Sequence, residues 1–245
     1  MAEKLYTIPV NDAFDEQSEC PICSMYKKLE DDSIAFMMGP SYMEDDIRME
    51  TDRLGFCKPH MLMLSKQENR LGLALILKTH LDRQKKEALE IAGKTVQGKK
   101  LFKKPEEAEI VRWAREKTAS CYICKRIDNM FSRYLDTVLR LYEKDADFRK
   151  KYSECKGFCQ EHFGMLIKKG QEVLREQELQ SFVTLTAKLY TDNLQRLADD
   201  LDWFTDKFDY RYRDAPWKNS RDAIERAVTK TNGIIQTKNE KGKEK

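Results

Sequence analysis

The sequence predicts an all-α protein with two tandem helical-hairpin repeats followed by long C-terminal helices. The 245 residues include only 10 Gly and 6 Pro, so helix breakers are few and regular elements should be long. One phrase occurs twice, as GFCKPH at residues 55–60 and GFCQEH at residues 157–162, which indicates an internal repeat. Apolar residues also recur at i+3 and i+4, the period of an amphipathic helix.

The first repeat is predicted to be a helical hairpin. A helix is expected over residues 24–38, with a stop at Gly39 and the proline after it. Ser41, with Glu44 three residues on, would open the return helix through a capping box, and Gly55 would end it. The two arms span ~22 and ~21 Å at 1.5 Å per residue. Equal arms would bring the chain back to its starting point.

The second repeat has the clearer helical pattern. Its apolar stripe consists of Ile127, Met130, Phe131, Tyr134, Leu135, Val138, Leu141 and Tyr142. A core is favoured over a partner surface here, because each helix needs one buried side. Asp145 is predicted to cap a shorter return helix that runs to about Cys155. A long third helix follows in each repeat, the first of them with a break near residues 67–69.

These elements divide the chain into three predicted segments. Residues 1–98 form the first repeat, and residues 99–225 form the second repeat with the C-terminal helices. Residues 226–245 are polar and basic and are predicted to be a flexible tail. The lysine-rich stretch 93–104 is predicted to join the repeats.

Composition narrows the classes of partner. Lys and Arg number 45 against 42 Asp and Glu, a net charge of +3, which gives no strong attraction to nucleic acid or to an anionic membrane. The longest apolar run, residues 71–77, is far shorter than the roughly 20 residues of a membrane span. The N-terminus lacks the pattern of a signal peptide. We therefore expect a cytoplasmic protein without a membrane partner, in which thiols stay reduced.

The cysteines and histidines predict two metal sites. Cysteines stand at positions 20, 23, 57, 121, 124, 155 and 159 and histidines at 60, 80 and 162. Each Cys-x-x-Cys pair is followed by one Gly-Phe-Cys-x-x-His phrase, after 33 and 34 intervening residues. By this order the predicted ligand sets are Cys20, Cys23, Cys57 and His60, and Cys121, Cys124, Cys159 and His162. Two such knuckles complete the tetrahedron that Zn²⁺ prefers, so we expect two Zn²⁺ ions. An iron–sulfur cluster is the alternative.

Two candidate ligands remain outside these sets. Cys155 could replace His162 in a four-cysteine site, but Arg53 stands at its counterpart in the first repeat, so a free or buried thiol is favoured. His80 has no ligand partner one helical turn away and is predicted to lie on a helix surface. Structural zinc contributes about 10–16 kcal/mol, against a domain stability of roughly 5–15 kcal/mol. Loss of a metal should therefore unfold the repeat that it holds.

Residues 199–220 concentrate aromatic and acidic side chains. A partner surface is one interpretation, with Trp203, Arg211 and Trp217 as anchors, because these residue types are enriched in interface hot spots. The alternative is a solvated acidic face opposite a buried stripe that ends at Phe208. A catalytic carboxylate–metal site is a third interpretation, with less support.

Several motifs together resemble a known family. They are YTIPVNDAFD at Tyr6–Asp15, CPIC at Cys20–Cys23, GFCKPH at Gly55–His60, CYIC at Cys121–Cys124, GFCQEH at Gly157–His162 and DWFTDKFDYRY at Asp202–Tyr212. The chain is similar, over nearly its whole length, to an uncharacterised family of bacterial proteins of unknown function. The resemblance implies one coherent protein and no particular activity.

The favoured function is a non-enzymatic zinc-binding helical scaffold that binds another protein. A closed four-ligand site leaves no open position for catalysis, and no phosphate loop, nucleotide fingerprint or nucleophile elbow occurs. A cytosolic metal or thiol redox sensor is the first alternative, with Cys155 as a resolving thiol. Nucleic-acid binding through the lysines at 99, 100, 103 and 104 is the second. The sequence predicts no oligomeric state.

Overall fold

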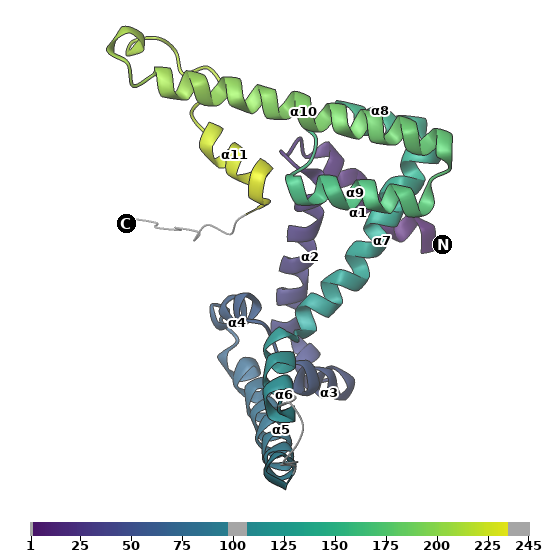
Figure 1. The fold of residues 1–245 in the computed structure, drawn as a ribbon, viewed down its shortest axis with the longest axis vertical. Coiled ribbons are helices and arrows are strands. Elements are labelled where there is room, and N and C mark those ends of the chain that lie inside the picture. The colour runs from purple at the N-terminus through teal and green to yellow at the C-terminus, as the bar shows by residue number, and fades with distance from the viewer. Residues whose placement is uncertain (1, 98–106, 235–245) are drawn as a thin grey trace, which may run out of the picture. The chain divides into compact units, whose positions relative to one another are not determined.

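Every regular element that the computed structural model describes is a helix (Figure 1). The structure describes residues 2–97 and 107–234, and these contain eleven α-helices, two short 3-10 helices and no strand. The predicted all-α class is therefore confirmed. None of the described helices is long and apolar enough to cross a lipid bilayer.

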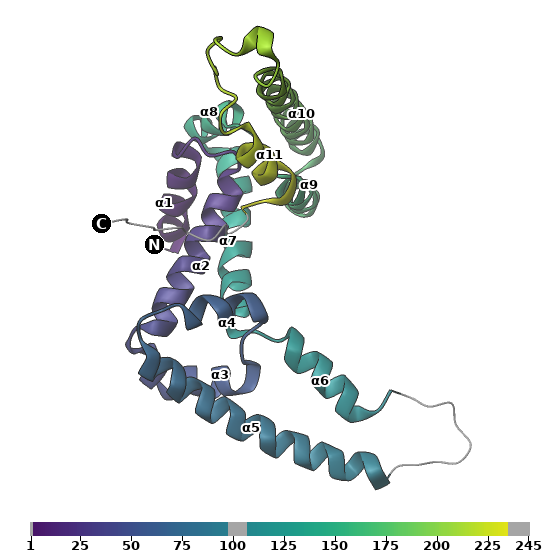
Figure 2. The same ribbon diagram turned by 90° about the vertical axis from the view of Figure 1, so that its left-hand side faces the viewer.

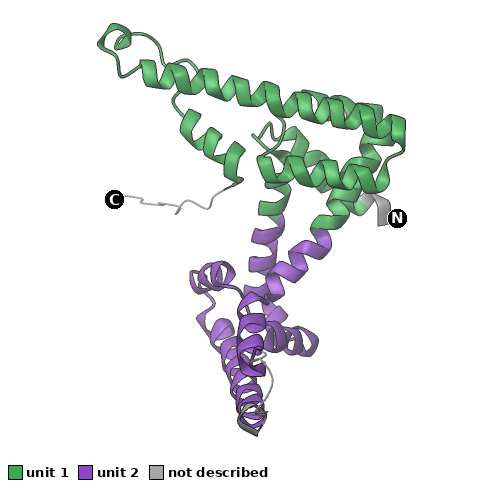
Figure 3. Ribbon diagram, viewed as in Figure 1, with its two compact units in different colours: residues 1–28, 131–245 green, residues 29–130 purple. Residues whose placement is uncertain are grey.

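The chain divides into two compact units, coloured separately in Figure 3. Unit 1 consists of residues 1–28 and 131–245, and unit 2 of residues 29–130. Two helices, α2 (Pro21–Met38) and α7 (Tyr122–Lys144), each begin in one unit and end in the other. The units therefore do not follow the predicted segments 1–98 and 99–225, since each segment contributes to both units.

Unit 1 is built around a cluster of aromatic rings. Besides its parts of α2 and α7, it contains α1 (Ala2–Asp15), α8 (Ala146–Glu154), α9 (Gln160–Val173), α10 (Glu176–Asp206), η2 (Tyr210–Tyr212) and α11 (Ala223–Asn232). The rings in mutual contact are Phe14, Tyr142, Phe148, Tyr152, Phe158 and Phe182. The buried Tyr152 hydroxyl lies 2.8 Å from the Thr186 hydroxyl, so the core keeps this polar atom hydrogen-bonded.

Unit 2 contains the remaining helices. They are η1 (Pro40–Met43), α3 (Asp45–Leu54), α4 (Lys58–Ser65), α5 (Arg70–Gln97) and α6 (Glu109–Ala119). Helix α3 packs on α5, as the two views in Figures 1 and 2 show. His80 of α5 contributes to this packing, since its Nδ1 lies 2.8 Å from the Asp52 carbonyl oxygen. His80 is buried, so the prediction of a surface histidine was wrong.

Several predicted helix ends agree with the structure. The Asp145 carboxylate accepts the backbone N–H groups of residues 147 and 148 at 3.0 Å each and so caps α8. Gly55 ends α3 with φ of +62°, and α4 and α5 are separated at residues 66–69. The capping box at Ser41 is not formed. Residues 40–43 form a 3-10 helix and α3 begins only at Asp45, because the Ser41 hydroxyl donates to the Phe36 carbonyl oxygen instead.

The C-terminal region differs most from the prediction. Helix α11 occupies the first part of the predicted flexible tail and packs against α9 and α10, and Lys230 within it is fully buried. The rest of the tail, residues 235–245, lies outside the described residues. The predicted joint begins inside α5, and its lysine cluster at 99–104 also lies outside the described residues.

Candidate metal centres

The eight predicted ligands lie in two compact clusters. The first centre consists of Cys20, Cys23, Cys159 and His162, and the second centre of Cys57, His60, Cys121 and Cys124. Within each cluster the ligand atoms all lie within 4.8 Å of one another, so each could hold one metal ion. The first centre belongs to unit 1 and the second to unit 2.

The prediction of which ligand pairs share a centre was wrong. Each centre joins the Cys-x-x-Cys pair of one predicted repeat to the Cys-x-x-His pair of the other. The prediction assumed hairpin arms of equal length, but α2 has 18 residues and α3 only 10, about 27 and about 15 Å. Helix α3 also packs on α5 rather than retracing α2. The chain therefore does not return Cys57 to Cys20, and the other repeat supplies the missing ligands.

The first centre has a spacing close to that of ligands around one tetrahedral ion. His162 Nδ1 lies 3.2 Å from Cys159 Sγ, 3.3 Å from Cys23 Sγ and 3.6 Å from Cys20 Sγ, and the Cys23 and Cys159 sulfurs are 3.6 Å apart. Bonds of ~2.3 Å to sulfur and ~2.0 Å to nitrogen, at tetrahedral angles, give spacings of about 3.5 to about 3.8 Å. All four side chains are buried, and the Phe131 ring lies 5.6 Å from the His162 ring.

The second centre has the same internal geometry and a more open setting. His60 Nδ1 lies 3.2, 3.3 and 3.4 Å from the sulfurs of Cys57, Cys121 and Cys124. The Cys57 and Cys124 sulfurs are 3.8 Å apart, and these two residues are only partly buried. The other ring nitrogen, His60 Nε2, lies 3.2 Å from Glu30 Oε1. Such a carboxylate fixes the tautomer and orientation of a metal-binding histidine.

All four ligand pairs lie at helix N-termini. Cys57 and Cys159 are the N-cap residues of α4 and α9, and the histidine of each pair follows in the first turn. Cys20 and Cys121 directly precede α2 and α7, and each sulfur lies 3.4 Å from the backbone nitrogen three residues on. Two helix N-termini therefore converge on each centre, where their dipoles favour thiolate over thiol.

The glycine of each repeated phrase has a positive φ, +62° at Gly55 and +74° at Gly157. A Cβ atom at Gly55 would lie 2.6 Å from the His80 ring, and one at Gly157 would lie 2.8 Å from the Leu189 carbonyl oxygen. Both conditions make any residue other than glycine unfavourable at these positions. This backbone turn directs the cysteine two residues later into the centre.

The carbonyl group before each glycine is bound by a group from elsewhere in its unit. In unit 2 the Ser120 hydroxyl donates to Leu54 O at 2.6 Å, and the Tyr122 N–H donates to Gly55 O at 2.9 Å. In unit 1 the matching carbonyl, Lys156 O, accepts from Lys230 Nζ at 2.6 Å. Each ligand pair is thus also fastened through its main chain.

The thiols within each centre favour one ionised sulfur. Hydrogen bonds from Cys20 and Cys23 lower the pKa of Cys159 far below that of a free thiol, whereas burial raises the pKa of Cys20. Burial also acts to raise the pKa of Cys121, but its hydrogen bonds with His60, Cys124 and Cys57 together outweigh burial, and the pKa falls to about 6. Because thiolate is the form that binds metals, each centre presents one at neutral pH.

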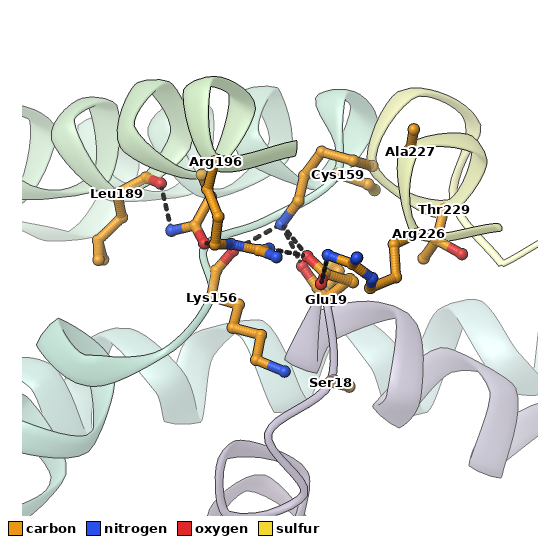
Figure 4. Close-up of polar contacts among 12 residues, drawn as sticks. Ser18, Glu19, Lys156, Cys159, Leu189, Arg196, Arg226, Ala227 and Thr229 are labelled. Carbon is orange, nitrogen blue, oxygen red and sulfur yellow. Dashed lines mark hydrogen bonds and ion pairs between the residues drawn. The ribbon is translucent and has the colours of Figure 1, made fainter. Parts of the chain in front are cut away.

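A buried ion-pair network adjoins the first centre (Figure 4). Glu19, the residue before Cys20, is buried, and its Oε2 lies 2.5 Å from Arg196 Nη2 and 3.3 Å from Lys230 Nζ. Arg226 Nη1 lies 2.8 Å from Asp200 Oδ2 and 4.0 Å from Glu19 Oε1. Sequence reasoning missed this network because residues 226–245 carried no signal of a packed helix.

The predicted partner residues lie in an aromatic lobe, residues 203–220, which follows most of α10. Trp203 is half-buried, donates from Nε1 to Pro216 O at 3.0 Å and is covered by Lys218 at 3.7 Å. Trp217 packs on Phe204, with ring centroids 5.9 Å apart. The two tryptophans therefore hold the lobe together.

The exposed rings of the lobe are not those of the two predicted tryptophans. Phe208 is 77% exposed and Tyr210 is 87% exposed, so Phe208 does not belong to the predicted buried stripe. Arg211 is exposed and pairs with the Asp209 carboxylate at 2.7 Å. The lobe backbone is held by Lys207 Nζ, which donates to the carbonyls of residues 212, 213 and 215 at 2.5–2.8 Å.

Cys155 belongs to neither centre. Its side chain is buried, and burial raises the pKa of its thiol to about 11. It is therefore a poor nucleophile at neutral pH.

Comparison with known proteins gives a family but no activity. Neither the curated proteins nor the solved structures contain a significant match. A family model described as "Family of unknown function (DUF6062)" matches residues 1–238. Since the match covers nearly the whole chain, the chain belongs to this family.

Proposed function

We propose that this chain is a non-enzymatic helical scaffold that binds two Zn²⁺ ions and another protein. The observation that carries the proposal is the pair of Cys₃His centres, each with four ligand atoms within 4.8 Å of one another. A site whose four positions are all filled by protein has no place for a reacting water, so its role is structural. A reducing compartment such as the cytoplasm would keep the thiols available for metal.

Zinc fits these ligands better than the alternatives. Three sulfurs and one imidazole nitrogen form a soft donor set that zinc takes as a tetrahedron. The ligand atoms of each centre lie within 4.8 Å of one another, which suits one ion. The ligands of an iron–sulfur cluster are instead distributed over several iron atoms.

The aromatic lobe supports the choice of a protein partner. Phe208 and Tyr210 are exposed on a loop whose backbone is fixed by Lys207. Rigid aromatic side chains lose little conformational entropy on binding and are enriched in interface hot spots. We therefore assign the contact to Phe208, Tyr210 and Arg211, with Trp203 and Trp217 holding them in position.

The redox-sensor alternative has less support in the fold. It required Cys155 as a resolving thiol, but this side chain is buried and its pKa is raised. A resolving thiol has to be accessible and readily ionised.

Elemental analysis of the protein purified without added metal tests the metal assignment. We expect two zinc atoms per chain and loss of helical circular dichroism on strong chelation. Iron in place of zinc, or helicity that is unchanged after the metal is removed, would refute the structural zinc role.

Affinity capture with matched variants tests the partner assignment. We expect a protein that is captured by the wild type and by Leu71→Ala, but not by Phe208→Ala/Tyr210→Ala. Leu71 is a suitable control because it is also exposed, at 67%, and lies in unit 2. Binding should then be repeated with the purified partner. Equal binding to all three forms would remove the lobe from the proposal.

A further inference from the structure

We propose that Lys230 is a positioning residue of the first centre, and that docking of α11 and metal binding at that centre stabilise each other. The inference depends on the proposed metal occupancy of the first centre and not on the protein partner. It gives a role to helix α11 and to the buried ammonium group of Lys230, neither of which is needed to supply the zinc ligands.

Lys230 joins the two ligand segments of the first centre. Its side chain is fully buried, and Nζ donates to the carbonyl oxygens of Glu19 at 2.5 Å and Lys156 at 2.6 Å. Glu19 directly precedes Cys20, and Lys156 lies three residues before Cys159. One ammonium group therefore holds both segments in register, although they are distant in the sequence.

A metal-loaded first centre would be anionic and would add counter-charge beside Lys230. A divalent ion with three thiolates and a neutral imidazole carries one net negative charge. Next to it are the carboxylates of Glu19 and Asp200 and the cations Arg196, Arg226 and Lys230. Asp222 also pairs with Arg226 at 2.9 Å, so the carboxylates and the anionic centre together supply counter-charge to the three cations. Because a buried cation is costly without its counter-charge, the anionic metal centre stabilises the docked Lys230.

Both ends of α11 are fixed to this region. At its C-terminal end, a Cβ atom placed on Gly233 would lie 3.7 Å from Cys23 Sγ, so the helix cap lies close to a ligand sulfur. At its N-terminal end, Arg226 contacts Asp200, Asp222 and the Asn219 carbonyl oxygen. The helix thus connects the first centre to the end of the aromatic lobe.

The second centre provides an internal reference. There the matching carbonyl, Leu54 O, is held by the neutral Ser120 hydroxyl, and a carboxylate, Glu30, orients the histidine. A change at Lys230 should therefore affect one centre and leave the other unchanged. Coupling of this kind is reciprocal, so α11 strengthens metal binding as much as the metal strengthens α11 docking.

Metal affinity in Lys230 variants tests the positioning role. Outer partners of metal ligands contribute about 10- to 100-fold to affinity, so Lys230→Met should weaken the first centre by about that factor. Lys230→Arg should restore most of the affinity, because it keeps the charge and the donors. If the role were packing alone, Met, which matches the lysine stem more closely, would be the better replacement. Lys188→Met, an exposed lysine of α10, is the control.

Cadmium NMR identifies the centre that changes. In the cadmium-loaded protein, Lys230→Met should shift or broaden one of two resonances, and a chelator should remove that ion first. Equal loss from both centres, or two unchanged resonances, would overturn the assignment.

Hydrogen exchange tests the coupling itself. At equal metal concentration, Lys230→Met should show faster hydrogen exchange in residues 223–232 than the wild type. A large excess of metal should slow the exchange in the variant again. If exchange in α11 is the same with and without metal at the first centre, the coupling is refuted while the scaffold proposal stands. If no metal is bound at all, both fail together.

Discussion

Two double variants distinguish ligand sets that combine both predicted repeats, as in the structure, from ligand sets formed within each repeat. Cys20→Ser/Cys159→Ser removes two ligands of the first centre and none of the second. The protein should then keep one metal ion of two. Cys20→Ser/Cys57→Ser removes one ligand from each centre and should leave neither complete. Ligand sets built from neighbouring motifs predict the opposite result for both variants.

The size of the effect follows from the burial of the first centre. Its four ligands are buried at the N-termini of α2 and α9, and structural zinc contributes about 10–16 kcal/mol. This matches or exceeds the roughly 5–15 kcal/mol that stabilises a typical domain. We therefore expect unit 1 to unfold in Cys20→Ser/Cys159→Ser, while the second centre keeps its four ligands.

Native mass spectrometry gives the metal count, and hydrogen exchange gives the location of the damage. A chelator is added at a concentration that leaves both metal ions bound in the wild type. At that concentration it should remove any ion that is held by only three ligands. Fast exchange is expected in α8–α11, with protection retained in α3–α5. One metal retained by Cys20→Ser/Cys57→Ser, together with none in Cys20→Ser/Cys159→Ser, would show that the exchanged arrangement is wrong.

Three further changes test local parts of the fold. In thermal melts, Gly157→Ala should lower the stability by about 1–3 kcal/mol, because φ is +74° and the new Cβ would lie 2.8 Å from Leu189 O. The control, Gly93→Ala, places its Cβ where no atom lies within 4 Å and should be neutral or slightly stabilising. The pKa of Glu87 is lowered to about 2 because its hydrogen bonds from α6 and α5 outweigh burial, so its contribution is complete above the unfolded-state pKa of about 4.3 and is lost as pH falls toward 2. Urea unfolding of the wild type and Glu87→Gln should accordingly differ at pH 7, and the difference should narrow as the pH falls below about 4.3. Lys207→Met removes three donors to lobe carbonyls and should accelerate hydrogen exchange in residues 207–219 with metal content unchanged; unaltered exchange there would contradict the fixed lobe.

Helix positions and candidate ligands could be predicted from the sequence because both depend on local patterns. A cap such as Asp145 acts within three residues, and a Cys-x-x-Cys pair acts within one helical turn. The structure gathers the same eight side chains that the spacing identified. Their role as metal ligands stays a prediction, which the elemental analysis tests.

Helix α11 could not be predicted, because its buried residues are an alanine and a lysine rather than large apolar side chains. Hydropathy would bury Ile224 and Val228, yet both are exposed, whereas Ala223 and Lys230 are buried. A buried lysine gives no signal in a sequence, since its burial depends on Glu19 and two carbonyl groups from distant segments. The two carbonyl groups that Lys230 binds lie 211 and 74 residues away in the sequence.

The exchange of ligand sets is a matter of geometry rather than of chain entropy. Cys20 and His162 are separated by 142 residues, whereas the expected partner His60 lies 40 residues from Cys20. With a closure cost that grows as 1.5RT ln n, the longer loop adds only about 1 kcal/mol. This is small beside the ~10–16 kcal/mol of a structural zinc site, so short spacing is a weak argument for any pairing. Helix length decides instead, because an 18-residue α2 cannot be retraced by a 10-residue α3 that packs elsewhere. Since each centre therefore draws on segments of both predicted repeats, neither predicted repeat contains all four residues of a centre by itself.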